Sequence, residues 1–360
     1  MDFTIDDEQK ALRNATRELA TRHAPQHGEG GDVPVGPAPH DSAAWTALVE
    51  MGALGLPFAE EVGGFGASHV EVSLVATELG RAGLQSAYAD ALVAGQVLAS
   101  AGQQDMLEQL IGGESLILAS FAQPGRGWSP LEPATTATAA GDDWTLSGAV
   151  GPIGCLSDAT AVIVPAQTPD GVALFLTEAG ERSAAGVLTL DGSAATQLVG
   201  PDKAAEVTVA AIGLGVVAIT GEALGAMEQA LTLTTDYLKT RKQFGVPLMT
   251  FQTLTQRAAD MYTSLELARS TVLFAAMALA ENPSDGRTAS RAKVVVGQSG
   301  RHIGQEAIQL HGGIGMTAEY SVGHLTSRLT AIEHTFGDTR QHLAGLAAGV
   351  SEYDMVDLLA

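Results

Sequence analysis

A long helical segment with a defined end constrains this sequence more than any other feature. Its apolar residues recur at steps of three, four and seven, as on one buried helix face: Leu224, Met227, Leu231 and Leu238. The segment closes on Arg241-Lys242-Gln243-Phe244-Gly245, where Gly245 suits the left-handed end of a helix and Pro247 cannot continue it. An arginine followed by an aromatic ring would suit a phosphate and an adenine, although a cation at a helix C terminus more often satisfies only the last carbonyls. We therefore expect the last third of the chain to be a helical bundle.

Length and composition indicate a soluble globular protein of two or three domains. The chain has 360 residues, of which 46% are apolar and 17% charged, and we expect no apolar run long enough to span a bilayer. A formal charge of −22 argues against nucleic acid and anionic membranes as partners, but a local arginine could still bind a phosphorylated ligand. The first residues lack the features of a secretory signal, and the single cysteine, Cys155, excludes an intrachain disulfide. Both observations favour the cytoplasm.

The first domain, residues 1–114, is expected to be helical. Thr4 and Asp7 resemble a capping box for a helix from Asp6 to about His23. Loops rich in glycine are expected over 27–39 and 61–66. Helical periodicity indicates further helices, a short one from Trp45 and others over 69–83, 87–101 and 105–111.

The second domain, residues 115–212, is expected to be a small antiparallel β-barrel or sandwich and not a parallel sheet. Short runs rich in β-branched or apolar residues, separated by turn clusters, are typical of such strands: 116–122, 135–139, 144–147, 159–166, 172–177 and 186–190. The third domain, residues 213–360, is expected to be a four-helix bundle in which the chain is helical again from about Gly213. Its later helices are expected over 251–280, 287–311, from near Ala318, and over 339–359. One face of the second carries Ala292, Val296, Ile303, Ala307 and Leu310.

Four stretches, in this order and these contexts, resemble the motifs of the acyl-CoA dehydrogenase family. The segment from Trp45 to Gly66 is similar to its Trp…Pro-Glu-x-x-Gly-Gly-x-Gly signature, and Arg241–Gly245 with Phe251-Gln252 resembles its Arg-x-x-Phe-Gly…Gln motif. The run Gln309-Leu310-His311-Gly312-Gly313-Ile314-Gly315 resembles Gln-x-x-Gly-Gly-x-Gly, and Thr339-Arg340-Gln341 resembles the Thr-x-Gln that opens the last helix. The resemblance covers essentially the whole chain and implies an α+β fold of helical domain, β-barrel and helical bundle.

The resemblance also implies flavin adenine dinucleotide (FAD) as the cofactor, with its ADP half held by the bundle of a neighbouring subunit. Arg241 would pair with the pyrophosphate, Phe244 would pack by the adenine, and Gln243 would offer an amide. Backbone at Gly312 and Gly313 could approach the cofactor closely, because no Cβ obstructs it. The full set of cofactor-binding residues expected from the motifs is Arg241, Gln243, Phe244, Leu248, Phe251, Gln309, Leu310, Gly312, Gly313, Thr339 and Gln341. No metal site is expected. Taken singly, the Gly-Gly pair could be an ordinary helix-terminating turn and Thr339 an ordinary N-cap.

The chain departs from the family at the catalytic base, a glutamate that takes the α-proton of the acyl-CoA. The resemblance places this base at Gly337, or in a minority of relatives at Gly215, so neither position holds a carboxylate. Glu222, Glu333 and Asp338 are nearby candidates for a relocated base, but they are more readily interpreted as ordinary solvated acids. A carboxylate displaced by about 5 Å, one helical turn, would miss the α-carbon.

The middle domain departs from the family as well. Gln123-Pro124-Gly125-Arg126-Gly127-Trp128-Ser129 replaces the loop that holds the flavin ring in relatives. Pro152 replaces a ring-covering tryptophan and Gly154 a hydroxyl residue that contacts flavin N5. The resemblance thus implies a chain that keeps the grip on a neighbour's ADP half but lacks its own ring pocket and base.

These features are similar to one subunit of the actinobacterial heterotetrameric (α2β2) acyl-CoA dehydrogenases that act on steroid side chains and other bulky CoA thioesters. The expected partners are a catalytic acyl-CoA dehydrogenase subunit, the acyl-CoA substrate and an electron-transfer flavoprotein. Two alternatives stay open. The chain could be a self-sufficient homotetrameric enzyme with a relocated base, or a non-enzymatic scaffold of the same fold. Neither the acyl group nor the partner's identity can be inferred from the sequence.

Overall fold

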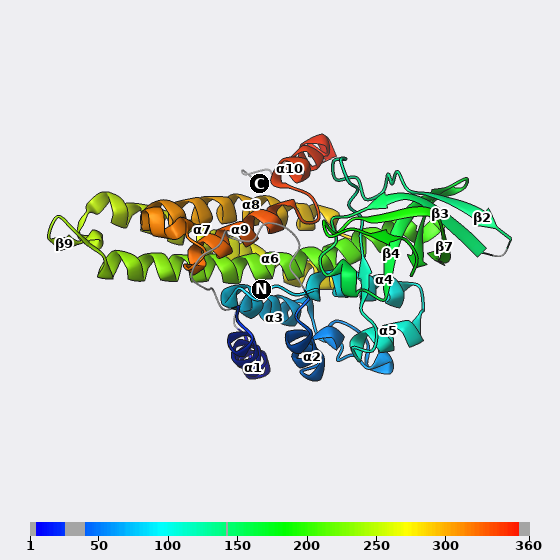
Figure 1. Ribbon diagram of the computed structural model, residues 1–360, viewed down its shortest axis with the longest axis horizontal. Coiled ribbons are helices and arrows are strands. Elements are labelled where there is room, and N and C mark those ends of the chain that lie inside the picture. The colour runs from blue at the N-terminus through cyan, green and yellow to red at the C-terminus, as the bar shows by residue number, and fades with distance from the viewer. Residues whose placement is uncertain (1–4, 26–39, 142, 353–360) are drawn as a thin grey trace, which may run out of the picture.

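The computed structural model describes residues 5–25, 40–141 and 143–352, and three parts follow one another along the chain (Figure 1). Helices form the N-terminal part, a β-sheet part lies at one end of the molecule, and a bundle of long helices extends to the other end. The expected α+β fold class is therefore confirmed.

The N-terminal part is helical, as expected. Its elements are α1 (Asp7–Arg22), α2 (Ser42–Glu50), α3 (His69–Ala82), α4 (Tyr88–Ser100) and α5 (Gln104–Ile111), with the 3-10 turns η1 (Ala53–Gly55) and η2 (Glu60–Val62). The first helix has a different cap from the expected one. Asp6 accepts the N–H of Gln9, and the Gln9 side chain accepts the N–H of Asp6, so the capping box begins at Asp6. Thr4 and the loop expected over 27–39 lie outside the described residues.

The middle part is a barrel of short strands. These are β1 (Ile117–Ala119), β2 (Thr136–Ala140), β3 (Asp143–Val150), β4 (Ala161–Thr168), β5 (Gly171–Thr177), β6 (Glu181–Arg182) and β7 (Leu188–Val199), with the 3-10 turn η3 (Leu156–Asp158) between β3 and β4. The strand order is β1-β4-β2-β3-β7-β5, and the pairing of β4 with β5 closes the sheet. Most pairs are antiparallel, but β4 is parallel to β1 and, at one position, to β2. The expected antiparallel barrel therefore includes the parallel pairing of β4 with β1, because the chain passes through β2 and β3 before β4 returns beside β1.

The third part is built on α6 (Pro201–Thr240), a helix of 40 residues. It begins at Pro201 and not near Gly213, because β7 continues to Val199 and proline suits the first position of a helix. The predicted apolar stripe is confirmed, since Leu224, Met227, Leu231 and Leu238 are at most 8% exposed.

The remaining helices pack around α6. They are α7 (Gln252–Glu281), α8 (Gly286–His311), α9 (Ser321–His334) and α10 (Thr339–Ala348), with the 3-10 turns η4 (Leu248–Thr250), η5 (Gly312–Met316) and η6 (Val350–Glu352). The apolar face predicted for α8 is buried, as expected. The last helix ends at Ala348, where Gly349 follows, and not at Leu359. Residues 353–360 lie outside the described part of the chain.

Helices α3 and α6 are in backbone contact. A Cβ atom at Gly225 would lie 1.8 Å from the carbonyl oxygen of Thr77, and one at Gly80 would lie 1.9 Å from that of Glu222. These glycines allow the close approach, because any side chain there would push the helices apart.

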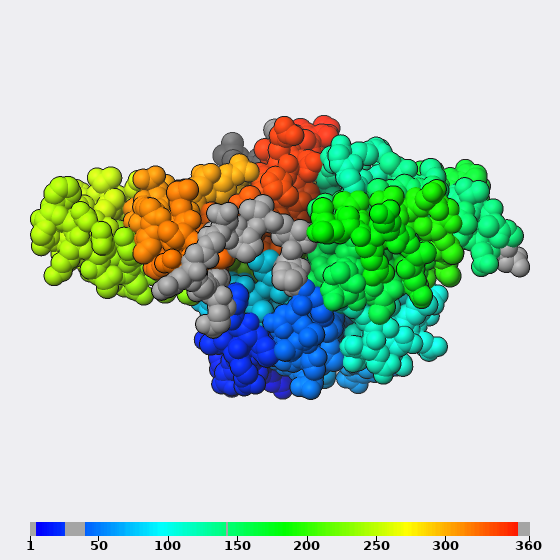
Figure 2. Space-filling model, in the orientation of Figure 1, coloured from blue at the N-terminus to red at the C-terminus, as the bar shows by residue number. Residues whose placement is uncertain are grey.

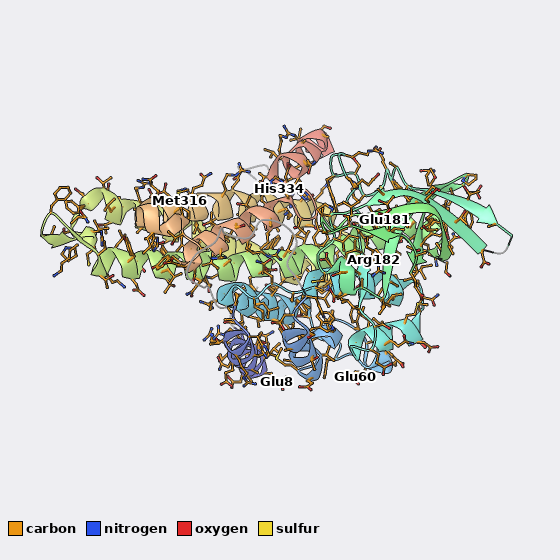
Figure 3. All side chains as sticks on the ribbon, viewed as in Figure 1. Glu8, Glu60, Glu181, Arg182, Met316 and His334 are labelled. Atoms are coloured by element: carbon orange, nitrogen blue, oxygen red, sulfur yellow. The ribbon has the colours of Figure 1, made fainter. Side chains whose placement is uncertain are left out.

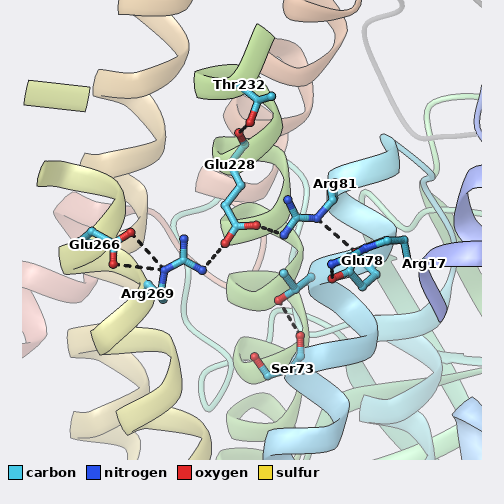
Figure 4. A network of polar contacts seen from close by, with 9 residues as sticks. Arg17, Ser73, Glu78, Arg81, Glu228, Thr232, Glu266 and Arg269 are labelled. Atoms are coloured by element: carbon cyan, nitrogen blue, oxygen red, sulfur yellow. Dashed lines mark hydrogen bonds and ion pairs between the residues drawn. The ribbon is translucent and has the colours of Figure 1, made fainter. Parts of the chain in front are cut away.

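A chain of alternating charges crosses the same helices (Figure 4). Glu78 on α3 accepts from Arg17 on α1 at 2.8 Å and from Arg81 on its own helix at 3.2 Å. Glu228 on α6 pairs with both Arg81 and Arg269, and Arg269 also contacts Glu266 on α7. The network ties α1, α3, α6 and α7 together. Since Glu78 and Glu228 are buried, each needs the guanidinium groups that surround it.

Two helices are long and apolar enough to cross a membrane by length and composition, which corrects the expectation that the chain has no such run. In α6, 89% of the most apolar window is buried inside the protein, so this helix is apolar because it forms the core. In α7 only 33% of the window is buried. The length and composition of one or two such helices are weak evidence for a membrane.

Candidate functional site

A β-hairpin at the far end of the bundle carries the first group of predicted cofactor residues. It consists of β8 (Lys242–Gln243) and β9 (Val246–Pro247), and its two turn residues, Phe244 and Gly245, have φ angles of 53° and 82°. Positive φ at both positions is typical of a type I′ turn, so Gly245 serves a hairpin and not the expected helix end. The Leu248 N–H donates to the Arg241 carbonyl at 2.8 Å and closes the hairpin.

The hairpin presents its predicted residues to solvent. Arg241 and Gln243 are exposed, and Phe244 is 92% exposed with its ring edge-on to Phe251 at 6.1 Å. Within the described residues the Arg241 guanidinium forms no ion pair. Leu248 and Phe251 are half-buried at the base of the hairpin. Arg241 is therefore available to an anion that the chain does not itself supply.

Aromatic stacking brings the second motif to the same end. Tyr237, one turn before Arg241 on α6, stacks on His311 at 4.6 Å, and His311 also contacts Tyr320 at 5.0 Å. His311 ends α8, so Gly312 and Gly313 directly follow a residue that stacks on the last turn of α6. A Cβ at either glycine would meet nothing within 4 Å, and Gly312 has a φ of 65°, so it also ends the helix. The backbone there faces open space.

Gln309 and Leu310 differ in their surroundings. Gln309 is exposed and can reach a ligand, whereas Leu310 is 6% exposed and its side chain belongs to the core. Only the backbone of Leu310 is left to approach a cofactor.

Exposed apolar side chains lie at this end of the bundle, and we call this group of residues the tip patch. Its residues are Phe244, Val246, Met249, Ile314 and Met316, each at least 39% exposed. In Figure 2 this end of the bundle projects beyond the N-terminal helices, and Figure 3 shows Met316 on that side of the molecule. Such a concentration of exposed apolar surface around an unpaired arginine indicates an interaction site.

Thr339 and Gln341 lie elsewhere, at the start of α10. Asp338 is the N-cap of this helix and Gln341 completes its capping box, so the interpretation of Thr339 as an N-cap is wrong. Thr339 packs beside Gly297 of α8. Gly297 and Gly312 are fifteen residues apart on α8, or about 22 Å along its axis. The structure thus separates the predicted residues into two groups, with nine at the tip and two at α10.

The first expected base position, Gly337, has no room for a side chain. Its φ is 89°, and a Cβ there would lie 2.8 Å from both Nε2 of His342 and Cδ1 of Trp128. His342 is fixed in place, because its Nε2–H donates to the Phe336 carbonyl at 2.8 Å and its Nδ1 accepts from the Ser290 hydroxyl at 3.1 Å. A glutamate could not occupy this position in the present arrangement.

The second expected base position, Gly215, is also closed. A Cβ there would lie 2.5 Å from Cγ2 of Val93 and 2.7 Å from Cε2 of Phe336. Phe336 is 6% exposed and packs edge-on against Trp128 at 6.2 Å. Phe336 and Trp128 therefore fill the space that both base positions border.

Trp128 comes from the loop that replaces the ring-holding loop of relatives. Gln123 anchors this loop, because its side chain accepts from the Ala134 N–H at 2.5 Å. A Cβ at Gly127 would lie 3.3 Å from Nε2 of Gln341, so the loop lies directly over the start of α10. Sequence comparison with the motifs predicted that the ring-binding groups are missing here, but it did not predict that Trp128 fills the space.

Glu222 is not a solvated acid, which corrects the sequence interpretation. It is 9% exposed, and the Arg328 guanidinium donates to both of its oxygens, at 2.5 and 2.9 Å. Asp90 lies near the same guanidinium. Burial raises the pKa of Asp90 to about 6, with Arg328 opposing and Glu222 reinforcing the shift. Both oxygens of Glu222 are held in a structural pair.

Glu333 is likewise buried, at 6% exposed, while Asp338 is half-buried as the cap of α10. Oε1 of Glu333 accepts from the Thr339 N–H at 3.0 Å and from Arg301 at 3.1 Å. Oε2 has no partner among the described residues and borders a space of about 10 Å³, enough for one water molecule. Glu333 therefore holds the start of α10.

Lys293 holds the other side of this corner. It is 2% exposed, and its ammonium donates to the carbonyls of Ile332, Glu333 and Thr335 at 2.7 to 3.2 Å. Burial lowers the pKa of Lys293 to about 7, while Glu333 and Asp338 oppose the shift. Glu333 and Lys293 thus hold the corner between α9 and α10, which contains the first expected base position, from both sides.

A groove of about 160 Å³ lies between α8 and α9, lined by Arg301, Gln305, Thr330, Glu333 and His334 among others. It borders neither Gly337 nor Gly215. Cofactor and ligand pockets usually have about 300–1,000 Å³, so this groove is too small for a flavin and its substrate.

Comparison with known proteins gives consistent matches along the chain. Residues 6–113 match the model of the acyl-CoA dehydrogenase N-terminal domain, and residues 205–351 that of the acyl-CoA dehydrogenase C-terminal domain. Acyl-CoA dehydrogenase FadE28 of Mycobacterium tuberculosis is 31% identical over 324 residues, which cover 86% of this chain and 92% of that protein.

Two solved structures share the fold over nearly the whole chain. A variant of the Tcur3481–Tcur3483 steroid ACAD is 29% identical with a TM-score of 0.85, covering 96% of this chain and 98% of the other. The ChsE4–ChsE5 complex of Mycobacterium tuberculosis is 24% identical with a TM-score of 0.86, covering 99% and 100%.

Proposed function

Because this chain belongs to the acyl-CoA dehydrogenase family, whose members use FAD, we propose that it is the non-catalytic subunit of a heteromeric acyl-CoA dehydrogenase. In the proposed α2β2 assembly, a catalytic partner supplies the flavin-ring pocket and the glutamate. This chain completes the partner's cofactor site with its tip.

The main support for the proposal is the lack of a carboxylate, and of room for one, at the two expected base positions. Both are glycines, and a Cβ at either one would collide with Trp128 and His342 or with Phe336 and Val93. A base must reach the reacting α-carbon within hydrogen-bond distance, and a substrate needs space beside it. This chain offers neither at the positions where its family places them.

The residues at the tip suit the ADP half of FAD. Arg241 is exposed and unpaired among the described residues, and a planar guanidinium can donate two parallel hydrogen bonds to a pyrophosphate. Phe244 offers a free ring face to the adenine, and Gln243 and Gln309 offer exposed amides. Open space at Gly312 and Gly313 allows close approach to the backbone. The surrounding tip patch would then be buried against the partner.

The residues around Trp128 do not suit the flavin ring. Trp128 and Phe336 occupy the space beside Gly337, and Pro152 and Gly154 replace the groups that hold the ring in relatives. Thr339 and Gln341 stand under the Trp128 loop and serve the cap of α10. We therefore assign this chain the ADP half of a shared site and no ring site of its own.

The proposed reaction is the α,β-dehydrogenation of an acyl-CoA, in which FAD, when bound, accepts the β-hydride. The residues of this chain bind and orient the half of the cofactor that is remote from the reaction. They contribute to catalysis by positioning the cofactor and not by proton transfer. The similarity to a steroid ACAD supports a bulky acyl group, such as a steroid side chain, as substrate. We further propose that an electron-transfer flavoprotein takes the electrons and that the assembly is cytoplasmic.

A relocated base within this chain has less support. Glu222 is held by Arg328 through both oxygens, Glu333 by Arg301 and the Thr339 N–H, and Asp338 by the α10 capping box. Glu222 would have to break a structural contact before taking a proton, and Glu333 and Asp338 are each held in place through one oxygen.

Expression of the chain alone and with its partner tests the proposal. A dehydrogenase subunit encoded in a neighbouring gene would be the natural candidate for the partner. We expect a colourless protein alone and a yellow assembly after co-expression, with about two flavins per four chains. Full flavin occupancy and turnover by the lone chain would instead support a self-sufficient enzyme, and no flavin in either preparation would support a scaffold.

Substitution of Arg241 tests the assigned contact. Arg241→Ala should release flavin from the co-purified assembly, whereas Lys242→Ala, which removes an exposed charge from the same hairpin, should not. A hydrogen bond to a charged group contributes about 1.5–3 kcal/mol, so flavin affinity should fall by about 10- to 100-fold. Equal flavin retention in both variants would contradict the role of Arg241.

A further inference from the structure

The side chain of His311 takes no part in the proposed cofactor contacts, although it stands in the middle of the second motif. It is 4% exposed and lies at the end of α8, directly before the two glycines. Tyr237 stacks on its ring at 4.6 Å with an interplanar angle of 30°, and Tyr320 lies against it at 5.0 Å with an angle of 52°. One buried imidazole thus contacts two tyrosine rings, and we call these three rings the tip stack.

The tip stack joins three segments that are far apart in the sequence. Tyr237 belongs to the last turn of α6, His311 ends α8, and Tyr320 is the N-cap residue of α9. Aromatic pairs prefer offset or tilted arrangements with ring centroids about 4.5–7 Å apart, and both contacts lie in this range. The stack therefore fixes the ends of three helices relative to one another at the tip.

Both parts of the predicted phosphate site are attached directly to this stack. The Arg241 N–H donates to the Tyr237 carbonyl at 2.8 Å, so the backbone of Arg241 is held by the residue that stacks on the imidazole. Gly312 follows His311 in the chain, and its N–H donates to the Ile308 carbonyl. A shift of the His311 ring against Tyr237 would therefore change the spacing between Arg241 and the backbone at Gly312.

The turn η5 folds back over the imidazole. A Cβ at the buried Gly315 would lie 3.0 Å from the Cβ of His311, so only glycine allows this approach. The residues on either side of Gly315 face outward in the tip patch, with Ile314 at 43% and Met316 at 73% exposure. The tip stack thus lies beneath the turn that carries part of the tip patch.

A hydrogen bond fixes the plane of the imidazole within the stack. Nδ1 of His311 lies 2.8 Å from the Ala307 carbonyl oxygen, and because that oxygen can only accept, Nδ1 carries the proton. Burial lowers the pKa of His311, while the carbonyl groups of Ala307 and Leu233 oppose the shift, so the ring is neutral at pH 7. Nε2 is buried and accepts no hydrogen bond among the described residues. A phenylalanine ring could therefore replace the imidazole at the cost of the Nδ1 bond alone.

We infer that His311 is a positioning residue of the shared cofactor site, and that through the tip stack it sets the spacing between Arg241 and the backbone at Gly312 and Gly313. Its ring does not contact the cofactor, because η5 covers it. The stacking itself does not depend on the proposed function, but its effect on flavin binding rests on that function. A displacement of about 1 Å in a positioned group can cost about 100-fold in rate, so a small shift at the stack is sufficient to matter.

Flavin affinity of the co-expressed assembly tests the positioning role. His311→Ala removes both ring contacts and should weaken flavin binding by about 10-fold or more, measured from the fluorescence of flavin released on dilution. His311→Phe keeps the rings in contact and should restore most of the affinity. Val296→Ala truncates a side chain with 2% exposure on the same helix, about 22 Å from His311, and is the matched control. It should lower the melting temperature and leave the flavin affinity unchanged.

Amide hydrogen exchange of the lone chain tests the stack without flavin. His311→Ala should speed exchange in the segments 241–248 and 312–316 by about 10-fold or more, because the rings that hold these segments have lost their contacts. His311→Phe and Val296→Ala should leave exchange in both segments close to that of the wild type.

The two measurements separate this inference from the proposed function. Unchanged exchange in His311→Ala would overturn the stack as the element that holds the tip. Unchanged affinity in a flavin-containing assembly, or equal losses in His311→Ala and His311→Phe, would overturn the positioning role of the rings. If the proposed function fails, the wild-type assembly itself contains no flavin. That result would remove the cofactor role, and the exchange of the lone chain would still decide the stack.

Discussion

Adding one methyl group at Gly337 should destabilise the protein, although the family motifs predict a catalytic glutamate at this position. In Gly337→Ala, the new Cβ would lie 2.8 Å from Nε2 of His342 and from Cδ1 of Trp128, with φ at 89°. A left-handed conformation costs a residue with a Cβ about 1–2 kcal/mol, and overpacking costs about 1–3 kcal/mol. The free energy of unfolding should therefore fall by about 2–5 kcal/mol.

Urea denaturation of three variants measures this effect. Gly345→Ala on α10 is the matched control, since a Cβ there meets nothing within 4 Å, and it should be neutral or stabilising by up to about 1 kcal/mol. In a Trp128→Ala background, the cost of Gly337→Ala should drop by about 1–2 kcal/mol, because one of the two collisions is removed. The dihedral cost should remain.

A neutral or stabilising Gly337→Ala would refute this reasoning. It would mean that Trp128 and His342 move aside at little cost, so the space beside Gly337 could open for a ligand. The same result would weaken the assignment of this chain as non-catalytic. Gly337→Glu should likewise gain no acyl-CoA dehydrogenase activity in the lone chain.

Three further changes test the charges and contacts of the fold. Asp90→Asn should raise the melting temperature at pH 7 but not near pH 4, because the half-buried Asp90, whose pKa desolvation raises to about 6, binds its proton more tightly than in the unfolded chain. The free energy of unfolding of the wild type should accordingly fall as the pH rises from about 4 to 6. Equal pH profiles of the two proteins would exclude this. Glu228→Gln should cost about 3 kcal/mol because it leaves Arg81 and Arg269 without their shared carboxylate, while Arg269→Ala, at a 44% exposed side chain, should cost about 1 kcal/mol in urea titrations. The reverse order would argue against a buried anchor at Glu228. Gly225→Ala should destabilise by about 3 kcal/mol or more, since its Cβ would lie 1.8 Å from the Thr77 carbonyl oxygen, and an unchanged melting temperature would contradict backbone contact between α3 and α6.

Most helices and strands could be predicted from the sequence, because local periodicity and turn residues set them. The buried stripe of α6 and the apolar face of α8 follow directly from the spacing of their apolar residues. The start of α6 at Pro201 was missed, since β7 and α6 meet at Gly200 without a turn cluster between them. The parallel pairing of β1 with β4 was missed for a different reason, because strand direction within a sheet depends on the path of the chain between them.

The burial and the ion pairing of Glu222 and Glu333 could not be predicted from the sequence. Glu222 is paired with Arg328, which lies 106 positions away, and Glu333 is paired with Arg301, 32 positions away. Neither spacing leaves a local signal, so both residues were interpreted as solvated. Exposure of a charged residue is decided by what packs over it, and its neighbours in the sequence do not report this.

By itself, the sequence determined the family resemblance, the residues that form the tip and the absence of a glutamate at Gly337 and Gly215. These depend on residue identity at fixed positions within local motifs. Only the tertiary structure decided that the vacated space is filled, because Trp128 and Phe336 meet from segments 208 positions apart. The tertiary structure also leaves an apolar face of α7 exposed. Packing depends on segments that are distant in the sequence. Residue types alone could therefore show that the glutamate is missing, but not which side chains fill the space beside its position.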